Sequence, residues 1–140
     1  MDYKISKEEL NPNNPDWKIH AVSDADTFKK NMCDCHTHGL RKYGSKELQL
    51  VLNVNLKTAS YILNSVGGMI RSGTKFQAGD RLFGLFENQS MAIGFIDEKD
   101  DMGADILRVC IPDENGNSFP EEATGVYALQ DSDPYIHLLS

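Results

Sequence analysis

Residues 48–68 decide the fold, and they read LQLVLNVNLKTASYILNSVGG. The first part, residues 48–54, is short, largely apolar and bounded by polar residues, which predicts a buried strand. Asn55 predicts a helix N-cap, because its side-chain oxygen can accept a hydrogen bond from the first helical turn. Apolar residues then recur at helical spacing until Gly67-Gly68, a pair typical of a helix end. We therefore expect a buried strand followed by one main helix over about residues 55–66.

Strand patterns surround this unit on both sides. Some segments alternate apolar and polar residues, and others are short apolar or β-branched runs that end at turns or at a proline. Short turns between most of them favour an antiparallel or mixed sheet with the helix packed on one face, so the predicted class is a single-domain α+β fold. The further predicted strands are residues 17–22, 69–71, 81–87, 90–97 and 106–111.

The length of 140 residues is typical of one domain. Residues 1–16 are polar and contain prolines and asparagines, which predicts an N-terminal arm or lead-in loop with room for a short helix at 6–10. The single globular domain is then expected to span residues 17–140. Its acidic region from about residue 121 is either a tail or adds a final strand at 135–139.

Composition excludes several classes of partner. A formal net charge of −7 with dispersed cationic residues argues against nucleic acid and against acidic membrane surfaces. The chain contains no apolar run of the roughly 18 residues that a membrane helix needs. The charged first ten residues lack the apolar core of a signal peptide, and three cysteines suit a reducing compartment, so we expect a cytoplasmic protein.

Concentrated chemistry is found in residues 33–39, which read CDCHTHG. Two thiols, two imidazoles and a carboxylate lie within six residues, and these groups are the usual ligands of zinc and other transition metals. The candidate metal ligands are Cys33, Asp34, Cys35, His36 and His38.

Strand geometry limits which of these side chains can meet. In a regular strand Cys33 and Cys35 would lie on one face, and Asp34, His36 and His38 on the other, so one ion could not bind all the thiols and imidazoles. The carboxylate and histidine face could hold an ion with a remote ligand such as His20 or His137, leaving a position for water. An irregular loop could instead wrap both thiols and a histidine around a closed structural site.

Two interpretations without a metal compete with this one. The cysteines can be buried as small apolar residues while the histidines bond to the backbone. Alternatively, two thiols separated by one residue can carry out redox exchange.

Several ordered motifs extend beyond this cluster. They are residues 33–40, 43–52, 62–64, 73–80 and 111–116, followed by Phe119-Pro120. In this order they resemble the bacterial family named domain of unknown function 4262, over roughly residues 17–122. The CxCHTHG motif marks a branch that bears cysteine and histidine. The resemblance implies the fold and a bacterial or phage origin, and it implies no activity or catalytic residue.

Two classes of function follow from these observations. An acidic small domain without a complete catalytic set is typical of a binding or regulatory module, for example an immunity- or defence-associated protein that docks a protein partner. The alternative is a metal-binding protein or a metal-dependent hydrolase that uses the segment from Cys33 to His38. Whether the chain is an enzyme stays open at this stage.

Overall fold

The predicted buried strand and the predicted helix are both present in the computed structural model, which describes residues 1–137. The strand is β4 (Glu47–Leu52), and the helix is α1 (Leu56–Arg71). Asn55 caps the helix as expected, because its side-chain oxygen accepts a hydrogen bond from the backbone N–H of Lys57 at 2.8 Å.

Within residues 1–137 the strands form one seven-stranded mixed sheet, which confirms the α+β class. The pairs β1·β5 and β4·β7 are parallel, and the other neighbours are antiparallel. In sheet order the strands are β1 (Asp2–Lys4), β5 (Arg81–Phe83), β6 (Ala92–Lys99), β7 (Asp105–Cys110), β4, β3 (Met32–His38) and β2 (Lys18–Val22).

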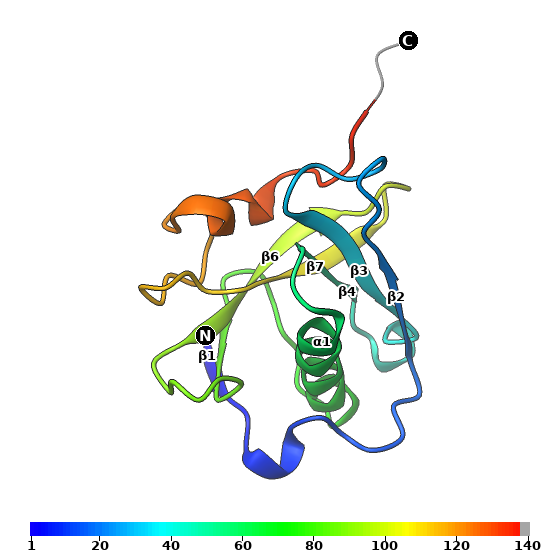
Figure 1. The fold of residues 1–140 in the computed structure, drawn as a ribbon. Helices are drawn as coiled ribbons and strands as arrows, with labels where there is room; N and C mark the ends of the chain where they lie inside the picture. The colour runs from blue at the N-terminus through cyan, green and yellow to red at the C-terminus, as the bar shows by residue number, and fades with distance from the viewer. Residues whose placement is uncertain (138–140) are drawn as a thin grey trace.

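The two faces of the sheet are covered by different parts of the chain. In Figure 1 α1 is seen almost end-on against one side of the sheet, and the C-terminal segment with the 3-10 helix η3 (Gly125–Asp131) lies beyond the other side. The face toward α1 is apolar and forms the main core, with Leu48, Leu50, Leu107, Val109, Ile93 and Phe95 packed against Ile62, Leu63, Val66 and Ile70. The opposite face holds buried polar side chains, among them Asp34, Gln49 and Arg108.

The predicted helix end is wrong. Gly67-Gly68 lies inside α1, which continues to Arg71, so the predicted strand at 69–71 is absent. The glycines serve close packing: a Cβ on Gly67 would lie 2.8 Å from ring carbons of Trp17, and one on Gly68 would lie 2.8 Å from Pro12. Tertiary contact therefore explains the glycine pair that suggested a helix stop.

Residues 1–16 differ from the expected arm. Residues 2–4 pair in parallel with β5, and Ile5 is buried in the main core. The short helix expected at 6–10 is present as η1 (Lys7–Glu9). This segment thus forms one edge of the sheet and crosses α1, because Ile5 and Leu10 pack against the main core.

The other predicted strands are present with small shifts at their ends. β2, β6 and β7 match the predicted segments closely, whereas β5 stops at Phe83. The segment predicted as a final strand at 135–139 makes an isolated antiparallel bridge between Tyr135 and Phe28, and its last two residues lie outside the described chain. Among the described residues, no helix combines the length and the apolarity needed to cross a membrane.

Candidate metal centre

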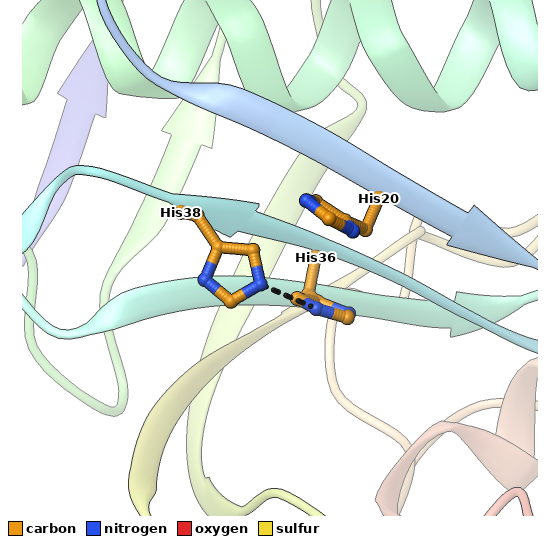
Figure 2. A group of neighbouring side chains, drawn as sticks. All are labelled: His20, His36 and His38. Carbon is orange, nitrogen blue, oxygen red and sulfur yellow. Dashed lines mark hydrogen bonds between the residues drawn. The ribbon is translucent and has the colours of Figure 1, made fainter.

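Three histidines meet at the edge of the sheet formed by β2 and β3. His20 lies directly opposite His36 in the antiparallel register, so both side chains leave the same face, and His38 follows two residues later on that face. Their ligating nitrogens all lie within 4.8 Å of one another. Figure 2 shows the three imidazoles side by side, with His36 and His38 joined by a hydrogen bond.

The rings of His36 and His38 are close enough to share one ion. Their Nε2 atoms are 3.1 Å apart. Two nitrogens bound to a tetrahedral zinc ion are about 3.3 Å apart, since each Zn–N bond is about 2.05 Å long. His20 stacks on His36 with ring centroids 5.6 Å apart and is exposed, so its ring is free to turn toward the same point.

Asp34 fixes the orientation of His36. Its Oδ1 accepts a hydrogen bond from Nδ1 of His36 at 2.9 Å. With the ring proton on Nδ1, the Nε2 atom carries the lone pair and points toward His38. A carboxylate behind a histidine in this way is the usual support of a metal-binding imidazole.

The Asp34 carboxylate is itself buried, with 4% of its residue surface exposed. Burial opposes its ionisation, but hydrogen bonds from His36, Tyr135 and Gln49 keep the pKa of Asp34 below its ordinary value. In return, the hydrogen bond to Asp34 raises the pKa of His36, and the charges of Asp101 and Asp100 act in the same direction. Asp34, Asp100 and Asp101 therefore place negative charge near His36, which favours a cation there.

A row of polar side chains connects this edge to the middle of the sheet. The register places His20, His36, Gln49 and Arg108 side by side on four successive strands. Gln49 donates to Asp34 Oδ1 at 3.1 Å and accepts from Nε of Arg108 at 3.0 Å. Asp34, Gln49 and Arg108 are buried and hydrogen-bonded in sequence, so the carboxylate that holds His36 is itself fixed.

A cleft of about 430 Å³ opens beside the histidines. His36 and His38 line it, together with Asp100, Asp101 and Met102 of the β6–β7 turn. Arg41 also lines the cleft, on the 3-10 helix η2 (Arg41–Tyr43). The carboxylate of Glu47 holds the chain before η2 by accepting the backbone N–H groups of residues 39, 40 and 41.

The structure separates the five candidate ligands into two groups. Asp34, His36 and His38 share the face predicted for a regular strand, and His20, rather than His137, is the remote histidine that joins them. His137 instead pairs with Asp133. Cys33 and Cys35 lie on the opposite face within the main core, where Cys33 Sγ is 3.5 Å from the carbonyl oxygen of Leu52. A closed site of both thiols and a histidine is therefore not formed.

Burial also makes the thiols poor nucleophiles. It raises the pKa of Cys33 to about 12 and that of Cys35 to about 11, with the nearby charge of Asp34 adding to both. Gln49, Arg108 and Tyr135 support the site in the structure, although no sequence motif predicted this role. Gln49 and Arg108 could have been noticed in the sequence, because each is a polar residue inside an otherwise apolar strand and would need a buried hydrogen-bond partner.

The chain matches no protein-family model, and neither curated proteins nor solved structures give a significant match. The resemblance to domain of unknown function 4262 and the bacterial or phage origin therefore stay predictions.

Proposed function

We propose that this protein binds a divalent transition-metal ion through His20, His36 and His38, with zinc as the ion that best suits the ligand set. The observation that carries the proposal is the convergence of three imidazoles whose ligating nitrogens lie within 4.8 Å of one another. Imidazole nitrogen is a ligand for zinc, copper, nickel and iron, and three histidines form a known catalytic type of zinc site.

The ligand geometry favours an ion over a purely structural cluster. A hydrogen bond between two neutral imidazoles joins one N–H to one lone pair, as between His36 and His38. A metal ion could instead accept the lone pairs of all three rings. The Nδ1 hydrogen bond to Asp34 already directs the lone pair of His36 toward His38. An ion bound here would replace the hydrogen bond between the Nε2 atoms of His36 and His38. Both rings would then aim their lone pairs at the ion, and the exposed His20 ring would turn toward the same point.

A hydrolytic role is the second candidate, and the cleft supports it. Three protein ligands leave a fourth position on a tetrahedral ion, and His36 and His38 both line the cleft of about 430 Å³. A metal ion with an open position lowers the pKa of bound water, and Asp100 or Asp101, which line the same cleft, are the candidates to accept a proton.

The test is elemental analysis and metal titration of protein purified without an affinity tag. The wild-type chain should hold close to one equivalent of metal, and the double variant His36→Ala, His38→Ala should hold none. His137→Ala is the matched control, because His137 is an exposed histidine outside the cluster. Cys33→Ala with Cys35→Ala is the second control, and it should keep the metal since both thiols lie on the other face.

Absence of metal from the wild-type protein, even after titration with Zn²⁺, Co²⁺, Ni²⁺ and Cu²⁺, would refute the proposal. The search for function would then move to a protein partner, as expected of a binding or regulatory module. Loss of metal in the cysteine variant but not in the histidine variant would point to a thiolate site instead.

A further inference from the structure

Tyr135 reaches the candidate metal centre from the other end of the chain. Its hydroxyl donates a hydrogen bond to Oδ2 of Asp34, while Oδ1 of the same carboxylate accepts from His36 and Gln49. Each oxygen of this buried carboxylate is thus held by a donor. Among the described residues, the hydroxyl of Tyr135 is the donor to Oδ2.

The backbone around Tyr135 is anchored to the sheet at several points. Lys29 donates its N–H to the carbonyl of Pro134 at 2.9 Å, and Ile136 donates its N–H to the carbonyl of Thr27 at 2.8 Å. The Tyr135 ring packs on Phe28 with centroids 4.8 Å apart. These contacts fix the position of the Tyr135 ring, and with it the position of the hydroxyl beside Asp34.

A second connection joins the same segment to the same network. Arg108 donates from one guanidinium nitrogen to the carbonyl oxygens of Gln130 and Ser132, at 3.1 and 2.8 Å. Its Nε donates to Gln49, which in turn donates to Asp34. Residues 130–135 therefore contact the support of His36 by two routes, one through Tyr135 and one through Arg108.

We propose that Tyr135 is a positioning residue of the metal site, which acts on His36 through Asp34, and that metal binding and docking of residues 130–136 stabilise each other. The proposal rests on the metal-binding function proposed above. Loss of the hydroxyl at position 135 would leave Oδ2 of a buried carboxylate without its donor. Asp34 would then be free to turn, and it would hold the His36 ring less firmly. Because binding linkage is reciprocal, whatever strengthens the ion's hold on His36 also strengthens the docked segment.

The experiment compares Tyr135→Phe with Tyr127→Phe in the full chain, by titration with Zn²⁺ against a competing chelator. Tyr127 lies in η3 of the same C-terminal segment, and its hydroxyl makes no hydrogen bond within residues 1–137. Tyr135→Phe should raise the dissociation constant for Zn²⁺ on the order of 10-fold, the lower end for support residues of metal ligands. Tyr127→Phe should leave it unchanged. In the wild type, Zn²⁺ should also slow amide hydrogen exchange at residues 135 and 136, and it should do so less in Tyr135→Phe.

An unchanged Zn²⁺ affinity in Tyr135→Phe would overturn the proposal while leaving the metal site intact. If the wild type binds no metal, the proposed function fails, and the positioning role is then judged on the metal-free protein. There the ¹⁵N chemical shifts of the His36 ring should change in Tyr135→Phe and stay constant in Tyr127→Phe. Shifts that are equal in the three proteins would overturn the positioning role as well.

Discussion

The two faces of β3 carry side chains of different chemistry. Asp34 and His36 take part in a polar network, whereas Cys33 and Cys35 sit one residue away among apolar side chains. Alternation of side chains along a strand produces this separation. The motif at residues 33–38 is continuous in the sequence, but in the structure one face of it belongs to the candidate site and the other to the hydrophobic core.

The thiols of Cys33 and Cys35 should react slowly in the folded protein. Burial raises their pKa values to about 12 and about 11, so the thiolate that a disulfide reagent needs is scarce at neutral pH. Labelling in native buffer should be at least about 100-fold slower than in denaturant, because a rise of two pKa units lowers the thiolate fraction by that factor. Absorbance of the released chromophore measures the rate. Rapid labelling of two thiols without unfolding would support the redox interpretation instead.

The Asp113 carboxylate should make stability depend on pH below about 4. A hydrogen bond from the Asn117 side chain, joined by backbone N–H groups of Asn117, Thr124 and Asn115, lowers the pKa of Asp113 to about 2. Because the folded value lies below the ordinary value of 3.8, the stabilisation is full above about 4 and is lost as the pH falls toward 2. Asp113→Asn should therefore lower the melting temperature at pH 7, and the difference from wild type should shrink between pH 4 and pH 2.

Calorimetry or circular dichroism at several pH values measures this difference. The control is Glu114→Gln, which changes an exposed neighbour and should leave the melting temperature unchanged. A constant difference between wild type and Asp113→Asn from pH 7 to pH 2 would contradict the prediction.

At the scale of elements, the packing of α1 depends on a residue without a side chain. Gly67 lets the Trp17 ring lie directly against the helix, and the indole N–H donates to the Asn64 side chain at 2.9 Å. Gly67→Ala would place a methyl group 2.8 Å from two ring carbons of Trp17. Overpacking of this kind costs about 1–3 kcal/mol, against a gain of about 1 kcal/mol in helix propensity. We expect a net loss of stability on the order of 1 kcal/mol.

Urea unfolding measures the change in the free energy of unfolding. Thr58→Ala is the matched control, because Thr58 is exposed on the same helix and its substitution adds helix propensity without a clash. Gly67→Ala should be less stable than wild type, whereas Thr58→Ala should be equal to it or slightly more stable. A stabilised Gly67→Ala would mean that the Trp17 ring moves aside at little cost.

At the scale of the whole molecule, Arg108 joins the sheet to the C-terminal segment. Arg108 is 2% exposed, and its guanidinium donates to Gln49 and to the carbonyl oxygens of Gln130 and Ser132. Arg108→Ala would leave these acceptors without their donor, at about 1–3 kcal/mol for each buried group. We expect the free energy of unfolding to fall by about 3 kcal/mol and amide exchange to rise over residues 125–137.

Arg81→Ala is the control for this variant. The Arg81 side chain is 42% exposed and pairs with Asp2 at 2.8 Å. A surface pair of this kind contributes at most about 1 kcal/mol. If Arg108→Ala destabilised the protein no more than Arg81→Ala, the network would not hold the two layers together.

Local patterns predicted much of the fold. The cap at Asn55, the apolar period of α1 and the alternation in β2 are properties of short segments, and each appears in the structure where the sequence placed it. The errors are at positions where the local conformation depends on a residue far along the chain. Trp17 and Pro12 pack against the glycine pair within α1, so these glycines do not end the helix. Residues 2–4 form a strand because they pair with β5. The candidate site divides in the same way, because alternation alone put Asp34, His36 and His38 on one face.

The sequence by itself determined the α+β class, the main helix and the shared face of Asp34, His36 and His38, since these follow from periods of 3.6 and 2 residues within one segment. Only the tertiary structure decided that His20 joins the cluster and His137 does not, because the choice depends on the register between β2 and β3. It also decided that Tyr135, 101 residues along the chain from Asp34, holds that carboxylate. Contacts between distant segments arise from the packing of the two layers on the sheet, and no local pattern encodes them.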